Sequence, residues 1–437
     1  MSCRAASLSH PGGFLISILS IRRLADRWKT AELLLDTDFR YLWMSNALWW
    51  QCRWMEELII GWVVLELTDS AGLVALVAFF RSAPFLFFGP FIGTVAQRFS
   101  YRQLILRSQQ INVAVSGALG ILGLIGTLAF WQVALGALLI GLGGAFDWSS
   151  RRSMIPDMVG KDRMMDAMML ENIPQNVSRV AGPVLSGMVL EFLGVRWCFP
   201  VLWVFYAAGL LFLLRMSHTP PPAKKDAAAI SPWKDLLEGL RYARSEPRIY
   251  GVLGITLFMN AFTFPFQAML PVFARDVLHQ GPQELGLLTA AIGVGSFIGV
   301  GLIDLVKSRQ YGGYVFAGSS FLSSISIMGF ALSTSYPLSV LLLVLCGIGQ
   351  AGFSVMQSSM ILEATPDVMR GRIMGTLVLA IGGGPPGRLQ IGALTTLLGT
   401  PLALCISAGI GALGIAWVTY ELPGFRKSTT PPEHAPP

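Results

Sequence analysis

Charged residues are scarce in this sequence. Only 13% of its 437 residues are Asp, Glu, Lys or Arg, and 53% are hydrophobic, whereas about 25% of an ordinary soluble domain is charged. A chain this apolar cannot cover a water-facing surface, which argues against two or three soluble domains. The basic residues behind the net charge of +7 lie in short loops between apolar runs. We therefore expect no nucleic-acid-binding face.

Cysteines, histidines and nucleotide-binding motifs are sparse as well. The five cysteines are scattered singly without C-x-x-C spacing, and the four histidines fall in loops or tails. This distribution argues against a disulfide framework or a zinc site, so no metal or cofactor is expected. The sequence also lacks G-x-x-x-x-G-K-[ST], which argues against self-contained ATP-driven transport. Without a nucleophile–base arrangement, no enzyme is expected.

Long apolar runs, by contrast, are abundant. A helix needs about 20 apolar residues to cross a bilayer, and runs of that length in lipid are helical. The sequence therefore predicts an all-α integral membrane protein with twelve transmembrane helices. Their approximate ranges are 41–66, 71–96, 104–126, 130–151, 167–192, 197–215, 249–273, 284–305, 314–333, 337–360, 373–395 and 400–420.

The distribution of Lys and Arg predicts how the chain is oriented. One set of loops is rich in both residues, around 98–102, 151–163, 224–248, 307–309 and 370–372, whereas the opposite set has little beyond Arg196 and Arg275. Basic loops stay on the cytoplasmic side. We therefore expect a multi-pass protein of the bacterial inner (plasma) membrane with both termini in the cytoplasm.

The longest connection, 217–248, divides the spans into six and six. Within it, Pro232–Arg244 has the 3.6-residue apolar spacing of a surface helix. The predicted organisation is a cytoplasmic N-terminal extension (1–40), an N-terminal six-helix half (41–216), a cytoplasmic linker (217–248), a C-terminal six-helix half (249–420) and a cytoplasmic tail (421–437).

The two halves carry similar sequence features. The segment 153–163 after the fourth span is similar to 359–370 after the tenth, and Gly187 and Gly194 have counterparts in Gly392 and Gly399. Internal repeats are typical of transporters whose binding site lies near mid-membrane between the repeats.

Four stretches resemble the major facilitator superfamily: Asp38-Phe-Arg-Tyr-Leu-Trp43, 236–244, 365–372 and Gly182-Pro-Val-Leu-Ser-Gly187. The resemblance runs from about Asp36 to Leu422 and is greatest to bacterial efflux proteins of the enterobactin-exporter and macrolide-efflux type. It implies two pseudo-symmetric halves that rock about a central site. It also implies export, and the Gly182-Pro183 stretch resembles the antiporter motif of the superfamily.

The superfamily's loop between spans 2 and 3 usually reads G-x-x-x-D-R-x-G-R-R/K. This chain has Gln97 in place of the Asp, Ser100 in place of the second Gly and Tyr101 at one basic position. The resemblance implies a cytoplasmic gate in which Arg98 or Arg102 pairs with Asp147, and the lost carboxylate weakens that inference. Alternatively, the arginines serve only to set topology. The predicted gate residues are Arg98, Arg102, Asp147, Asp367, Arg370 and Arg372.

Several ionisable residues lie at membrane depth, where each costs roughly 2.5–3.5 kcal/mol to insert. Span 1 contains Arg53, Glu56 and Glu57, and span 2 contains Arg81. Glu57 and Arg81 are both roughly 15–17 Å deep at 1.5 Å per residue, so an ion pair between the two spans is expected. Proton coupling through Glu56 or Glu57 is one hypothesis. A permanent ion-pair network between spans 1 and 2 is the alternative.

A polar face on each of several spans predicts a substrate cavity. Arg179 lies on one helix face with two Asn residues, where it could bind an anionic or catecholate-like group or pair with a carboxylate. The run 382–387, rich in Gly and Pro, is expected to interrupt span 11. The predicted cavity residues are Asn46, Trp50, Arg53, Arg81, Asn172, Asn176, Arg179, Asn260, Phe264, Gln267 and Gln357.

These features together predict a secondary active transporter. It would export a small amphipathic molecule, such as a siderophore, a macrolide or another drug-like compound, by proton antiport with alternating access. The expected partners are the substrate, protons and the lipid bilayer, with no obligate protein partner. A lipid or lysolipid flippase and a non-transporting membrane receptor or scaffold are the two alternatives.

Overall fold

The structure, a computed structural model, describes residues 32–88, 100–160, 162–217, 232–306, 312–366 and 369–422, and these residues form helices and no strand. A short 3-10 helix, Glu32–Leu35, precedes the first long helix. Most of the predicted N-terminal extension therefore lies outside the described residues. The helices of the N-terminal half are α2 (Thr37–Thr68), α3 (Ala71–Phe88), α5 (Tyr101–Leu124), α6 (Phe130–Val159), α7 (Met164–Leu193) and α8 (Val195–Arg215).

The predicted surface helix of the linker is confirmed as α9 (Pro232–Ser245). After it, the chain forms the second group of helices. These are α10 (Pro247–Phe258), the π-helical turn η3 (Met259–Thr263), α11 (Phe266–Asp276), α12 (Pro282–Val306), α13 (Gly312–Leu332), α14 (Tyr336–Ala364), α15 (Arg370–Ile381), α16 (Gly384–Leu398) and α17 (Thr400–Glu421).

These helices match the twelve predicted spans in order. Within the described residues, seven of them are long and apolar enough by themselves to cross a membrane. The remaining five spans correspond to α2, α3, α5, α7 and the pair α15–α16. The predicted interruption of span 11 is confirmed at Gly382 and Gly383, between α15 and α16. Span 7, predicted as one continuous helix, is instead divided by η3 and Pro265 into α10 and α11.

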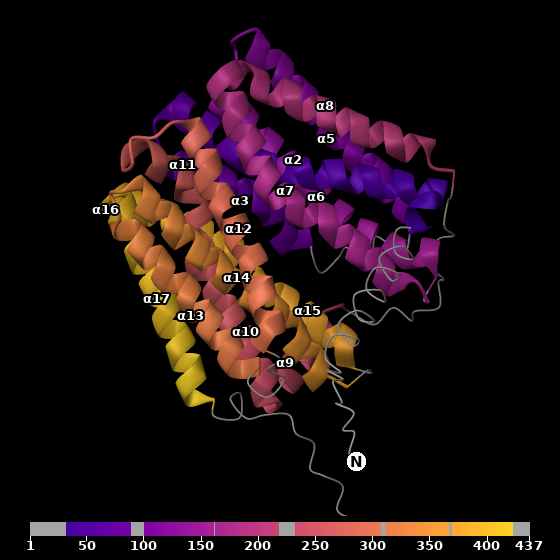
Figure 1. Ribbon diagram of the computed structural model, residues 1–437, viewed down its shortest axis with the longest axis vertical. Helices are drawn as coiled ribbons and strands as arrows, with labels where there is room; N and C mark the ends of the chain where they lie inside the picture. The colour runs from indigo at the N-terminus through magenta and orange to yellow at the C-terminus, as the bar shows by residue number, and fades with distance from the viewer. Residues whose placement is uncertain are drawn as a thin grey trace, which may run out of the picture.

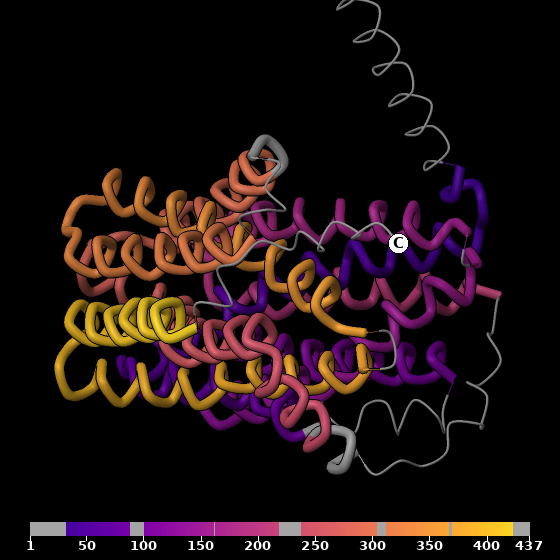
Figure 2. Tube along the Cα trace, turned by 90° about the horizontal axis from the view of Figure 1, so that it is seen from below, coloured from indigo at the N-terminus to yellow at the C-terminus, as the bar shows by residue number. Residues whose placement is uncertain are grey.

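The two groups of helices form two bundles. Figures 1 and 2 show the N-terminal half (indigo to magenta) beside the C-terminal half (orange to yellow). In Figure 1 the bundles meet near α11 and α16 and diverge toward the end where α2 begins and α17 finishes. We call this the terminal end of the molecule and the other the opposite end. The halves contact each other mainly through α7 with α12 and α3 with α16.

The repeated glycines have equivalent roles in the two halves. Gly194 and Gly399 have φ values of 79° and 81°, and each makes the tight turn that joins two antiparallel helices. Such positive φ angles favour glycine. Gly187 lies against the start of α12, and Gly392 lies against Ala75 of α3. The internal repeat seen in the sequence thus corresponds to the two contacts between the halves.

Candidate transport site

Glu56 and Glu57 are neighbours on α2 but project to different sides of the helix, because successive residues are about 100° apart. Glu56 is fully buried inside the N-terminal half. Its Oε1 accepts a hydrogen bond of 2.6 Å from the hydroxyl of Tyr206 on α8, and its Oε2 lies 3.5 Å from Nη2 of Arg81 on α3. Glu56 therefore joins three helices of one half.

Glu57, in contrast, bridges the two halves. Its Oε2 lies 3.6 Å from Nη1 of Arg81, and its Oε1 lies 3.7 Å from Nη2 of Arg388 on α16. The side chain of Glu57 is 27% exposed, whereas that of Glu56 is 0% exposed. The predicted ion pair between spans 1 and 2 is thus confirmed, and the structure adds a partner from the C-terminal half.

Two further arginines lie near these carboxylates. Arg53 stacks over the ring of Phe85 at 5.9 Å, and its backbone carbonyl accepts a 2.9 Å hydrogen bond from Arg81. Arg179 on α7 donates a 2.6 Å hydrogen bond to Oε1 of Gln350 on α14 and lies 5.4 Å from the ring centroid of Trp54. Among the described residues, neither Arg53 nor Arg179 has a carboxylate within 4 Å.

The cluster therefore carries an excess of positive charge. Arg81 and Arg388 pair with the Glu57 carboxylate. Arg179 lines the same cavity as Glu57, and the backbone carbonyl of Arg53 accepts a hydrogen bond from Arg81. Against these four cations, the described residues of the cluster supply two carboxylates, Glu56 and Glu57. Buried uncompensated cations are costly in a low-dielectric interior. The arrangement suits a ligand with oxygen acceptors and disfavours an organic cation.

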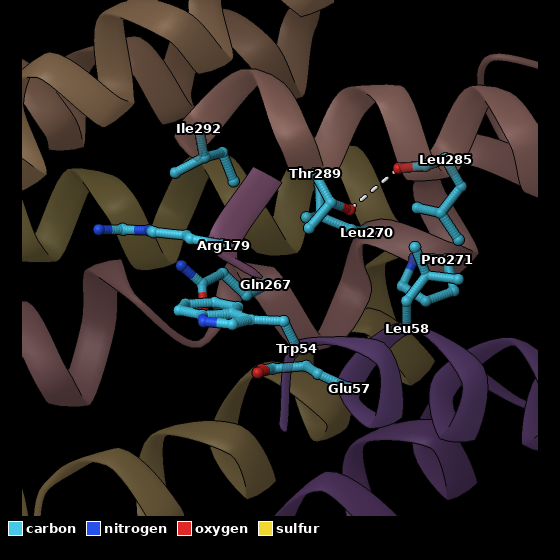
Figure 3. Close-up of a pocket in the computed structure, with 10 residues that line it drawn as sticks. All are labelled: Trp54, Glu57, Leu58, Arg179, Gln267, Leu270, Pro271, Leu285, Thr289 and Ile292. Atoms are coloured by element: carbon cyan, nitrogen blue, oxygen red, sulfur yellow. Dashed lines mark hydrogen bonds between the residues drawn. The ribbon is translucent and has the colours of Figure 1, made fainter. Parts of the chain in front are cut away.

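A small cavity lies between the halves at this level (Figure 3). Trp54, Glu57 and Arg179 of the N-terminal half line it together with Gln267 and Thr289 of the C-terminal half, and Leu58, Leu270, Pro271, Leu285 and Ile292 complete its walls. In Figure 3 the Arg179 side chain lies above the indole of Trp54, with the Gln267 amide beside it. The cavity volume is about 30 Å³. That holds a water molecule or two, whereas a drug-sized ligand needs roughly 300 Å³ or more.

The opposite end of the molecule is closed. Arg275 of α11 pairs with Asp69 at the end of α2 and also donates a 3.4 Å hydrogen bond to the carbonyl of Leu65. On the α7–α12 contact, a Cβ at Gly187 would lie 2.6 Å from the carbonyl oxygen of Pro282. Only glycine allows the helices to approach this closely.

At the terminal end, no such contact joins described residues of the two halves. Between described residues, every hydrogen bond and ion pair that joins the halves lies at the central cluster or at the opposite end. Asn172 and Asn176 share a helix face with Arg179, which points toward α14. They lie toward the terminal end of α7 and are exposed. The polar face predicted for span 5 is therefore covered by the C-terminal half near Arg179, and its residues nearer the terminal end are exposed.

A second polar network fills the interior of the N-terminal half. Arg151 of α6 pairs with Asp147 at 2.8 Å and donates hydrogen bonds to Asn46 and, at 3.3 Å, to Gln109. Asn46 in turn donates a 2.8 Å hydrogen bond to Glu171 of α7. These side chains are buried. The network therefore ties α2, α5, α6 and α7 together.

Arg151, Glu171 and Gln109 are not among the residues predicted for the cavity or the gate. Arg151 stands at the predicted end of span 4, where the sequence indicates a basic loop, but α6 extends eight residues further, to Val159. Glu171 lies inside the predicted span 5, so its charge at membrane depth was the available signal. Trp50 belongs to the same network, because its indole N–H donates a 3.1 Å hydrogen bond to Glu171. Asn46 and Trp50 thus pack within one half.

The residues predicted for the cytoplasmic gate have partners that differ from those expected, or lie outside the described residues. The predicted partner of Asp147 was Arg98 or Arg102, and in this structure Asp147 pairs instead with Arg151 one turn along the same helix and not with Arg102. Residues at i and i+4 lie on one face and need no other element to meet. Arg102 donates a 2.7 Å hydrogen bond to the carbonyl of Met216. Arg98 and Asp367 lie outside the described residues.

In the second predicted gate segment, Arg370 begins α15. Arg372 forms a 2.8 Å ion pair with Glu238 of the linker helix α9.

Of the predicted cavity residues in the C-terminal half, one lines the cavity and the other three pack within that half. Gln267 lines the cavity. Phe264 instead packs edge-to-face on Phe353 at 5.3 Å, and Asn260 donates a hydrogen bond to the carbonyl of Thr256 on its own helix. Gln357 donates a 2.8 Å hydrogen bond to Thr256 and is buried between α14 and α10. Asn260 lies in the π-helical turn, which alters the register that uniform helical spacing predicted for Asn260 and Gln267.

A family profile described as transmembrane secretion effector matches residues 31–437. The enterobactin exporter EntS of Shigella boydii serotype 18 is 28% identical over 353 residues, which cover 78% of this chain and 81% of the exporter. The EntS protein of Shigella boydii serotype 4 is 28% identical over 380 residues, covering 84% of this chain and 88% of its own length.

Several solved structures share this fold. A bacterial homologue of the human lysosomal transporter Spinster, described as inward-facing and unoccupied, has a TM-score of 0.70 at 14% identity and covers 92% of this chain and 99% of its own. The POT family transporter PepTSo has a TM-score of 0.71 at 14% identity, with coverages of 88% and 97%. At these identities the likeness shows the fold alone, which is that of the major facilitator superfamily.

Proposed function

Because the chain belongs to the transmembrane secretion effector family of major facilitator transporters, we propose that it exports a small amphipathic molecule in exchange for protons. The observation that carries this proposal is the placement of Glu57. Its carboxylate lies at the central cavity, is partly exposed and is shared between Arg81 of one half and Arg388 of the other. A proton taken up there removes one ion pair within a half and one between the halves.

Glu56 is the less suitable proton carrier of the two. It is fully buried and is held by the Tyr206 hydroxyl as well as Arg81, all within the N-terminal half. Its protonation would alter the packing of that half without touching the contact between the halves. We therefore assign the coupling role to Glu57 and a positioning role to Glu56.

Alternating access is the motion that fits this geometry. The halves touch at the opposite end through Asp69 and Arg275, while Asn172 and Asn176 are exposed toward the terminal end. We place the terminal end in the cytoplasm, because the loops on that side hold most of the Lys and Arg. This conformation would then be open to the cytoplasm, ready to receive a substrate that leaves after the halves rock.

The substrate class follows from the charge and lining of the cluster. The surplus of arginine over carboxylate, together with the amides of Gln267 and Gln350, favours a neutral or acidic molecule rich in oxygen acceptors. Trp54 adds an aromatic surface. The named function of the EntS relatives makes a siderophore the first candidate to test. Macrolides and other drug-like compounds are the further candidates.

The test is substrate-driven proton movement in everted vesicles from a bacterial host that lacks its own pumps. Enterobactin, erythromycin and ethidium serve as probes, and a pH-sensitive dye reports protons. We expect efflux of an acceptor-rich probe, sensitive to a protonophore, and little transport of the ethidium cation. Glu57→Gln should reduce the proton signal at least tenfold while membrane expression persists.

Glu191→Gln is the matched control, since Glu191 is exposed near the opposite end of α7 and lies outside the cluster. It should leave coupling unchanged. Normal coupling in both Glu57→Gln and Glu56→Gln would overturn the proton assignment. Lipid scrambling in reconstituted vesicles, with no efflux of any probe, would favour the flippase alternative.

A further inference from the structure

The linker helix α9 is fixed to the end of the C-terminal half. Glu238 forms a 2.8 Å ion pair with Arg372 of α15, and Ala243 is buried in the adjoining core. A Cβ at Gly239 would lie 2.8 Å from the carbonyl oxygen of Arg372 and 2.6 Å from the hydroxyl of Thr376. Glycine at this position therefore allows α9 to lie directly on α15. The helix is thus part of the folded bundle.

The face of α9 turned away from the bundle combines apolar and basic residues. Leu237 is 63% exposed and Leu240 is 43% exposed, and Arg241 and Arg244 are exposed beside them. At 100° per residue the four side chains fall within about 100° of one another. Glu238 lies off this face and already neutralises Arg372. The face is therefore both apolar and cationic.

The position of α9 brings this face to the level of the bilayer surface. The helix ends at Ser245, and α10 begins at Pro247 as the first part of an apolar span. Figure 1 shows α9 at the terminal end of the C-terminal half, below α10 and beside α15. At this level leucines can enter the acyl boundary while arginines meet phosphate groups, as interfacial helices do.

We propose that this face of α9, formed by Leu237, Leu240, Arg241 and Arg244, binds the headgroups of anionic phospholipids. Two arginines without carboxylates between them complement a negative headgroup, and the leucines supply the apolar contact that free phosphate lacks. Because α9 lies on α15, a bound lipid also holds the first turns of α15. That segment leads through the Gly382–Gly383 break to Arg388 and Glu57.

The experiment measures lipid binding and does not depend on the transport proposal. Native mass spectrometry of the full-length protein would compare phosphatidylglycerol with phosphatidylcholine of the same acyl chains. An arginine near a membrane surface contributes on the order of a fivefold gain in binding to anionic lipid. We expect Arg241→Gln/Arg244→Gln to weaken the tightest phosphatidylglycerol binding by about 25-fold and to leave phosphatidylcholine binding unchanged.

Two further double variants and one single-residue control make the result decisive. Arg241→Lys/Arg244→Lys keeps the charge and should keep the binding, and Leu237→Gln/Leu240→Gln should weaken binding to both lipids. Removal of the exposed Arg196 at the other membrane face (Arg196→Gln) controls for a general loss of charge. Unchanged phosphatidylglycerol affinity in the double Gln variant, purified as a monodisperse protein, would overturn the proposal. Loss of binding in the double Lys variant would do so as well.

Discussion

At the scale of single residues, two adjacent glutamates have different surroundings. Successive residues of a helix are about 100° apart around its axis, so Glu56 faces Tyr206 whereas Glu57 faces the contact between the halves. The sequence indicated both glutamates and Arg81, because charges inside apolar runs are rare and are retained for a reason. It could not separate their roles, because the deciding partners, Tyr206 and Arg388, lie far away along the chain.

The first prediction concerns the partner of Glu56. Tyr206→Phe removes the donor of the 2.6 Å hydrogen bond and leaves the Glu56 carboxylate buried with Arg81 alone. Leaving such a group short of a partner costs about 1–3 kcal/mol. We expect a lower thermal unfolding midpoint in detergent, with transport retained at lower temperature. Tyr250→Phe, which removes an exposed hydroxyl on α10, should leave the midpoint unchanged. Equal midpoints for the two variants would contradict the structural role of Glu56.

At the scale of the elements, glycine and proline determine where helices bend and how closely they approach. The break in span 11 was predictable because Gly382–Gly387 is too rich in Gly and Pro for a continuous helix. The π-helical turn in span 7 was not. Pro265 has no backbone N–H to donate, and a helix can accommodate this with a kink or with a π turn. Which of the two forms depends on neighbouring residues, such as Gly387, which lies against the Ala261 carbonyl.

The second prediction concerns the close contact of α7 with α12. Gly187→Val places methyl groups where the Pro282 carbonyl lies. The substitution should destabilise the conformation that is closed at the opposite end by about 1–3 kcal/mol. The population should shift toward the conformation open at that end. Thr289→Cys, in a background without other cysteines, reports this shift. In the Gly187→Val protein this cysteine should react at least fivefold faster than in the parent protein with an impermeant maleimide added from the Asp69 side.

Gly301→Val is the matched control for this substitution. Gly301 lies on α12 as well, but nothing occupies the space within 4 Å of its added Cβ. Its labelling rate should equal that of the parent protein. If Gly187→Val labels no faster than Gly301→Val, the contact is not what keeps the opposite end closed.

At the scale of the whole molecule, composition and basic loops were sufficient to predict twelve helices in two halves. They were not sufficient to predict the conformation. Which end is open depends on a few contacts between residues about two hundred positions apart, such as Asp69 with Arg275. Pairing across such distances leaves no periodic signal in one sequence.

The third prediction uses the contact at the opposite end. Asp69→Cys combined with Arg275→Cys would allow a short, cleavable bis-thiol reagent to join the halves where the ion pair now lies. Transport should stop on crosslinking and return on cleavage, because the halves can no longer separate at that end. A pair on one helix, Glu66→Cys with Asp69→Cys, should be crosslinked without loss of transport. Full transport by the joined protein would contradict a rocking motion.

The ion pairs of the central cluster also have a consequence for biosynthesis. Helix α2 carries Arg53, Glu56 and Glu57 and is absent from the seven helices that are apolar enough to span a membrane unaided. Helix α3 supplies Arg81, the cation that faces both glutamates. Each helix by itself would expose unpaired charge to lipid as it left the ribosome, whereas the two together present a largely neutralised pair. The first two spans should therefore enter the bilayer as one hairpin, so that the ion pairs of Arg81 with Glu56 and Glu57 are made during synthesis.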